Sequence, residues 1–103
     1  MIDFRLASAA QIQAELGERL RQQRLSRSWT QRDLAMRAGI AVNAVRNLEA
    51  GGNATVLSMV KVLQVLSLVH ELGEVFKPGV ALSIADLERL EQPQTKRARA
   101  RKS

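Results

Sequence analysis

Arginine is the residue best suited to bind a ligand in this 103-residue sequence, and the arginines are unevenly distributed along it. Residues 17–61 hold seven arginines and one lysine against three acids, which gives this segment a formal charge of +5. Residues 96–103 carry a further +5, whereas residues 1–16 and 62–95 are acidic at −1 and −3. Clustered guanidinium groups suit phosphate, because they present fixed, permanently charged donors. The two basic segments therefore have the electrostatic footprint of a phosphate-backbone binder, from which the acidic segment should face away.

Few side chains in the sequence suit catalysis. His70 is the only histidine, and it lies at helical spacing among apolar residues, as an ordinary surface or core imidazole does. No carboxylate pair, Ser/His/Asp set or glycine-rich phosphate loop is present, so the sequence predicts a protein that is not an enzyme and needs no cofactor. One histidine and no cysteine also argue against a protein-held metal such as zinc, and they exclude disulfides.

The first basic segment contains two short helical patterns separated by one glycine. Thr30 and Asp33 have the spacing of a capping box, which predicts a helix over residues 31–38. Gly39 ends this helix, since glycine adopts the positive φ needed there without a Cβ penalty. A second helix is predicted over residues 42–50, because two further glycines follow it.

Further helices are predicted on both sides of this pair. Ser8 and Gln11 have the spacing of a second capping box, which begins a helix that reaches about residue 25. The segment 56–66 is apolar nearly all round, so the following segment or a second subunit should cover part of it. The remaining expected elements are a short helix over 68–76 capped by Ser67, a capped helix over 84–91, a linker at 92–95 and a disordered basic tail at 96–103.

The length of the chain favours one domain, expected over residues 1–91, with the linker and tail over 92–103. Residues 1–6 alternate apolar and polar side chains, which fits either a short strand paired with a second subunit or a frayed terminus. The most apolar run, residues 56–72, contains Lys61 and Glu71, so it does not fit a membrane span. The lack of a signal pattern and of cysteine fits a cytoplasmic, nucleoid-associated protein.

The small and apolar residues of the two central helices resemble the phage-repressor, or XRE, class of helix-turn-helix domain, which would cover residues 16–66. The matching residues are Gln31, Leu34, Ala35, Ala38, Gly39, Ile40, Val45, Leu48, Glu49 and Gly51. A short turn with glycine between two helices is the signature of the motif. The resemblance implies an all-α, lambda-repressor-like domain of five to six helices that binds double-stranded operator DNA as a homodimer. The alternative is an αα-hairpin with no nucleic-acid role.

In that family the second helix of the pair enters the major groove, and its exposed residues contact bases. By this resemblance Val42, Asn43 and Asn47 are the expected base-contacting residues, and Arg46 lies on the same outward face. Asparagine can bond N6 and N7 of adenine, Arg46 can pair with guanine or phosphate, and Val42 can pack on a thymine methyl. Val42 and Ala41 depart from the family pattern, which often has a polar residue at the first position, and Ala41 is a poor N-cap.

Other residues are expected to contact the DNA backbone or to hold the helices together. Phosphate contacts are predicted from the N-terminus of the helix over residues 31–38 and from the side chains of Gln31, Arg32, Arg27, Arg37 and Asn53. In the resembled family, Gln31 contacts either backbone or base at the edge of a half-site. The family also implies an ion pair between Arg24 and Glu49, for which the alternative is two separate solvated charges.

Residues 67–103 resemble HipB-type regulators of toxin–antitoxin operons. This second resemblance implies repression of the protein's own operon and a HipA-like kinase toxin as a partner. The basic tail would contact phosphates, enter a minor groove, dock on an acidic partner protein, or serve only as a solubilising tail. The competing prediction is a protein-binding adaptor that has lost base recognition, which Ala41 and Val42 favour.

Overall fold

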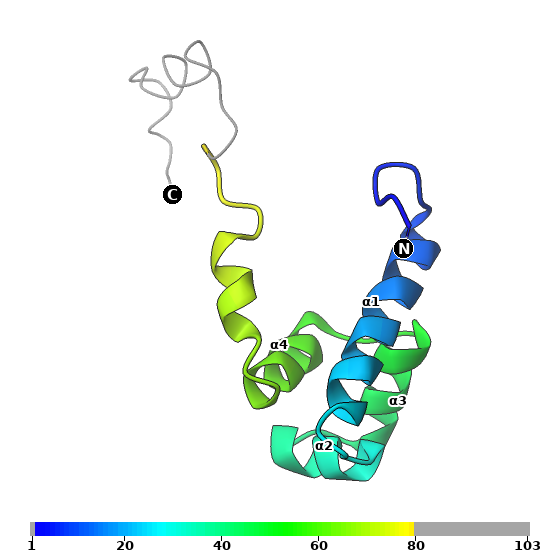
Figure 1. The fold of residues 1–103 in the computed structure, drawn as a ribbon, viewed down its shortest axis with the longest axis vertical. Coiled ribbons are helices and arrows are strands. Elements are labelled where there is room, and N and C mark those ends of the chain that lie inside the picture. Colours follow the sequence, from blue (N-terminus) through cyan, green and yellow to red (C-terminus); the bar gives the residue numbers. More distant parts are fainter. Residues whose placement is uncertain (1, 80–103) are drawn as a thin grey trace. The chain divides into compact units, whose positions relative to one another are not determined.

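The computed structural model describes residues 2–79 and contains only helices and turns in that range (Figure 1). The elements are α1 (Ala9–Leu25), α2 (Gln31–Ala38), α3 (Val42–Ala50), α4 (Val56–Val65) and the 3-10 helix η1 (Val69–Glu74). The predicted all-α class is confirmed, and the first three helices have the predicted bounds. The chain divides into two units, Met1–Gly73 and Glu74–Ser103. The predicted helix at 84–91, the linker, the tail and the boundary at 91/92 lie outside the described residues.

Side chains cap three of the four α-helices of residues 2–79 at their N-termini. Ser8 and Thr30 each accept a hydrogen bond from the backbone N–H three residues on, and Gln11 and Asp33 complete the two predicted capping boxes. Hydrogen bonds from the backbone and the side chain of Thr30 lower the pKa of Asp33. Thr55 caps α4 in the same way, whereas Ala41 gives α3 no side-chain cap.

Each of the four α-helices within residues 2–79 is followed, within three residues of its last helical residue, by a residue with left-handed backbone conformation. In each case the next N–H donates to the carbonyl oxygen five residues before it, which is the Schellman arrangement. Two of these residues are glycines and two are serines with φ near +60°, namely Gly39, Gly51, Ser28 and Ser67. Because Ser67 has this left-handed conformation, it does not cap the next helix as predicted. A helix does form within the predicted range of 68–76, but it is the shorter 3-10 helix η1.

Residues 2–7 form a turn and not the strand that their alternation would allow. The carbonyl oxygen of Asp3 accepts hydrogen bonds from the N–H groups of Leu6 and Ala7 at 3.0 and 3.1 Å. Its carboxylate accepts from the backbone N–H of Arg5 at 2.9 Å and from the guanidinium at 3.2 Å. These local hydrogen bonds use backbone groups that a strand would need. Aspartate side chains often compete with regular secondary structure in this way.

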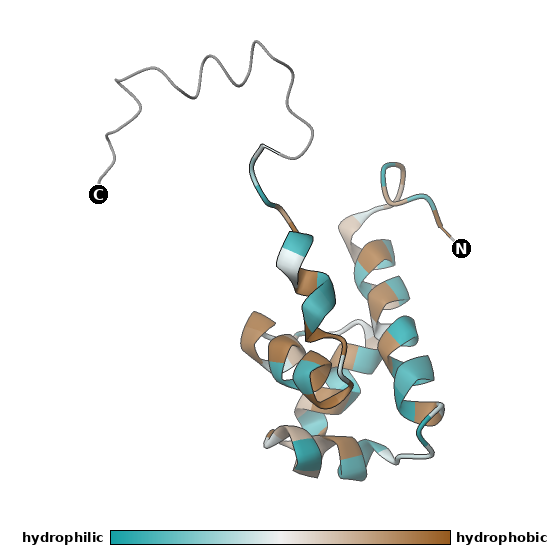
Figure 2. Ribbon diagram, turned by 60° about the vertical axis from the view of Figure 1, so that its left-hand side comes forward, coloured by the Kyte–Doolittle hydropathy of each residue, from teal (hydrophilic) through white to brown (hydrophobic). Residues whose placement is uncertain are grey.

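All four α-helices contribute to one apolar core. Helix α1 packs on α3, and α2 packs on both α3 and α4. The buried apolar residues are Leu20, Leu34, Ala35, Val45, Leu48, Val62 and Leu66, with Trp29 partly buried against them. Helix α4 is apolar along most of its length (Figure 2), and it leaves Val56 and Leu57 exposed. The core therefore uses only part of the apolar surface that α4 offers.

Gly17 sets the distance between α1 and α3. A Cβ atom at this position would overlap the carbonyl oxygen of Leu48 and lie 2.7 Å from that of Glu49. Those oxygens belong to the backbone of α3, so neither can move aside without shifting the helix. Gly17 was not among the predicted packing residues, because an isolated glycine inside a helical pattern has several explanations.

Arg24 and Glu49 form a buried ion pair that joins α1 to α3. The Nε and Nη2 atoms of Arg24 donate to the two carboxylate oxygens at 2.7 and 3.0 Å, and the two side chains are 9% and 4% exposed. Arg24 also donates to the carbonyl oxygen of Trp29 at 2.8 Å, and Gln31 donates to Glu49 at 3.1 Å. The hydrogen bonds with Glu49 raise the pKa of Arg24, against the opposing effect of burial. The network thus ties α1, α2 and α3 together.

Replacing Gly17 by alanine should lower the free energy of unfolding. Overpacking costs about 1–3 kcal/mol, and here the added methyl meets rigid backbone, so this exceeds the gain of roughly 1 kcal/mol in helix propensity. Urea unfolding followed by Trp29 fluorescence measures the change. Gly73→Ala is the matched control, because a Cβ atom there meets nothing within 4 Å. Equal effects of the two substitutions would contradict the close approach at Gly17.

Glu49→Leu should destabilise the protein by about 3–5 kcal/mol, because it leaves the Arg24 guanidinium buried without its counterion. The double variant Arg24→Met/Glu49→Leu should be more stable than this single variant, since no buried charge is then left unpaired. Urea unfolding of the two single variants and the double variant gives the coupling energy. Strictly additive losses would show that the pair is not coupled.

Candidate nucleic-acid interface

Helix α3 has one buried face and one exposed polar face. Val45 and Leu48 are 0% and 6% exposed, and Glu49 is buried beside them. Asn43, Arg46 and Asn47, whose spacing puts them on the opposite side of the helix, are exposed. Because α1 and α2 both pack on α3, its inner face is fixed, while its polar face stays exposed in the part of the chain that the structure describes.

Val42 does not share this exposed position. It is partly buried and packs against the core cluster, so its predicted outward placement is wrong. The reason is helical spacing, since Val42 lies three residues before the fully buried Val45 and falls near the same face. Val42 therefore serves the core as well as the surface, and only part of its side chain remains open to a ligand.

Four of the seven arginines in the basic segment are occupied within the protein. Arg19 and Arg21 pair with glutamates of α1 at 2.9 and 3.4 Å, and Arg24 belongs to the buried pair. Arg27 donates to the carbonyl oxygens of Gln23 and Leu66, each at 2.6 Å, and so joins the end of α1 to the end of α4. These hydrogen bonds give Arg27 a structural role, which sets it apart from the other residues predicted to contact phosphate.

The other three arginines all lie on the helix-turn-helix pair. Arg32 and Arg37 on α2 and Arg46 on α3 are exposed, and none of them forms an ion pair with residues 2–79. The guanidinium of Arg37 lies 4.3 Å from the centre of the Trp29 ring, in a cation–π contact. The charge that remains available for a phosphate backbone is therefore concentrated on α2 and α3.

The remaining predicted contacts lie at the borders of this pair of helices. Gln31 is the first residue of α2 and is partly buried, with one side-chain N–H donated to Glu49. Asn53 is exposed in the turn between α3 and α4. Asn43 and Arg46 are predicted from the sequence as two separate base contacts. In the structure, Nη1 of Arg46 donates a hydrogen bond to Oδ1 of Asn43 at 3.0 Å. Their spacing of three residues on a helix is the signal that predicts such a pair.

The sequence model of the helix-turn-helix family matches residues 20–71, about half of the 103 residues. The chain belongs to this family, in its XRE type. It is accordingly a DNA-binding transcription regulator, and the exposed face of α3 lies within the matched range. No match is found among curated proteins.

None of the helices within residues 2–79 is both long enough and apolar enough to span a bilayer. In the same range no three or more His, Cys, Asp or Glu side chains gather in a way that would hold a metal ion.

Proposed function

We propose that the protein is a transcriptional repressor that inserts α3 into the major groove of its operator. The observation that carries this proposal is the polar, exposed face formed by Asn43, Arg46 and Asn47 on a helix whose other face is buried. A helix held in this way can reach base edges without loss of its core contacts. Val42 would add a partial apolar contact beside these three residues.

Phosphate contacts would come mainly from α2. Arg32 and Arg37 offer guanidinium groups that form no ion pair with residues 2–79, and Gln31 lies where the free amides of α2 begin. Asn53, exposed after α3, would contact the backbone at the other end of the base-contacting helix. We leave Arg27 out of this set, since two carbonyl oxygens already engage its guanidinium.

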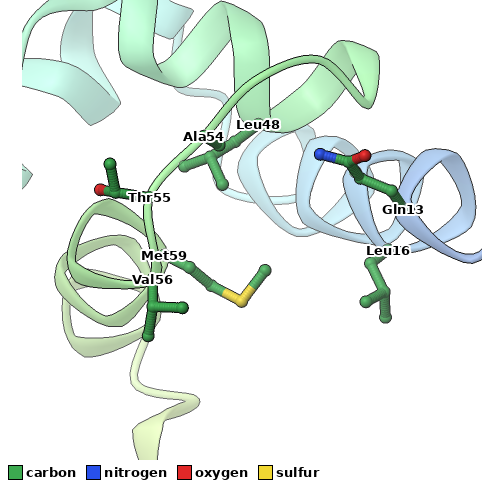
Figure 3. A pocket seen from close by; sticks show the side chains of 8 residues that line it. Gln13, Leu16, Leu48, Ala54, Thr55, Val56 and Met59 are labelled. Atoms are coloured by element: carbon green, nitrogen blue, oxygen red, sulfur yellow. The ribbon is translucent and has the colours of Figure 1, made fainter. Parts of the chain in front are cut away.

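We further propose that the protein binds a palindromic operator as a homodimer through α4. Val56 and Leu57 are 79% and 63% exposed. Beside them lies an apolar pocket of about 100 Å³, into which Met59 of α4 points from one side and Leu16 of α1 from the other (Figure 3). Exposed apolar surface of this kind marks interaction sites. Two copies would place their α3 helices about 34 Å apart, or a multiple of that distance.

The resemblance of residues 67–103 to HipB-type regulators supports a more specific role. The protein would repress its own operon and act as the antitoxin of a HipA-like kinase toxin, with the kinase activity in the partner. The second candidate is an adaptor that contacts only a partner protein. The uncapped start of α3 at Ala41 and the part-burial of Val42 favour it, because both weaken base recognition.

Binding to random duplex DNA should weaken steeply between roughly 50 and 200 mM salt, because each phosphate contact releases counterions. Arg32→Ala should reduce the slope of log K against log[salt] by about 1. Arg21→Ala is the matched control, since this arginine pairs with Glu18 on α1 and should leave the slope unchanged. Fluorescence anisotropy with a labelled duplex measures both. A protein that binds no duplex at either salt concentration would be the adaptor.

Leu57→Asp should convert the proposed dimer to a monomer, because it places a charge on the exposed apolar face of α4. Leu57 is 63% exposed, so the fold should tolerate the change. Met36→Asp is the matched control, as this side chain is 73% exposed but belongs to α2. Sedimentation equilibrium gives the oligomeric state of each variant. A Leu57→Asp dimer as tight as the wild type would exclude this face as the contact.

A further inference from the structure

Asn43 and Arg46 lie one turn apart on the exposed face of α3, and their side chains are bonded to each other. The Nη1 atom of Arg46 donates to Oδ1 of Asn43 at 3.0 Å. We propose that these two side chains contact DNA as one unit, and that this unit selects guanine over adenine. The inference rests on the proposed operator binding and adds the kind of base that this part of the site takes.

The partner fixes the orientation of the asparagine amide. A guanidinium group has donors and no acceptor, so Asn43 can bond Arg46 only through its carbonyl oxygen. Its amide nitrogen, with two N–H donors, then faces away from Arg46. The arginine has five N–H donors, of which this bond uses one. The unit therefore presents donors and a positive charge toward anything that approaches the exposed face of α3.

Nothing on α3 draws Arg46 away from this arrangement. The one acidic residue of the helix, Glu49, lies on the buried face and is paired with Arg24. Within residues 2–79, Arg46 makes no ion pair. An exposed hydrogen bond of this kind contributes little in water, but it strengthens when a groove excludes the solvent around it. The pair is therefore held most firmly when α3 is bound to DNA.

The major-groove edges of adenine and guanine present different hydrogen-bonding groups to this unit. Adenine presents the N7 acceptor and the N6 amino donor, so a bidentate contact needs the asparagine oxygen as acceptor. That oxygen keeps a second lone pair, but the adjacent guanidinium would direct its N–H donors at the N6 amino group, which is itself a donor, so the two groups cannot bond. Guanine presents two acceptors, N7 and O6, which match a unit of donors. Guanine is therefore favoured.

The test is selection of binding sites from a randomised duplex library by the full-length protein and by its variants. The wild type should enrich guanine at the base pair that faces Asn43 and Arg46. Arg46→Ala should shift the preference at that base pair toward adenine by about tenfold, because the freed amide regains its bidentate adenine contact. Arg21→Ala, which removes an exposed arginine from α1, should leave the selected sequence unchanged.

The possible failures are distinguishable. A wild-type protein that enriches adenine at this base pair would overturn the inference, as would an Arg46→Ala variant with the same preference as the wild type. In both results the protein still binds DNA, so the proposed function stands. A wild type that enriches no sequence and shows no salt-dependent duplex binding would overturn the proposed function and the inference together. Because both side chains are exposed, equal thermal unfolding of the variants serves as the check on folding.

Discussion

The buried ion pair between Arg24 and Glu49 is the contact on which the arrangement of this domain depends. A guanidinium and a carboxylate cannot both be buried unless each finds partners for its donors and acceptors. Here the partners come from three helices, since Trp29 accepts from Arg24 and Gln31 donates to Glu49. The bond geometry therefore fixes α3 against α1 and the start of α2. Gly17 permits the short distance between α1 and α3 that the pair requires.

The same constraint decides what the arginines of the segment can do. Arg19 and Arg21 form exposed ion pairs with glutamates on α1, and Arg27 donates to backbone carbonyl oxygens at the ends of α1 and α4. Within residues 17–61, only the arginines of α2 and α3 remain exposed without an ion pair to residues 2–79. In the complex that we propose, DNA phosphates would be the anionic partners of these arginines. A formal charge of +5 over the segment is therefore a poor guide to the charge that a ligand meets.

Several local features were predictable because neighbouring residues decide them. The capping boxes at Ser8 and Thr30, and the glycine after α2, act within one turn of backbone, and the helix bounds follow from them. The failures also have a local cause. Ser67 fits an N-cap by residue type, but it adopts the left-handed conformation that ends α4, and serine chemistry alone does not distinguish the two. The turn at Asp3 likewise replaces a strand that alternation alone would allow.

For α1, α2 and α3 the sequence by itself determined where each helix begins and ends, and that α2 and α3 make the helix-turn-helix pair. Those properties depend on contacts between residues a few positions apart. The tertiary structure alone decided that Val42 joins the core, that Gly17 sets the helix spacing, and that Arg27 bonds the end of α4. Each of these depends on atoms brought together from distant segments, and a pattern along one chain does not record them.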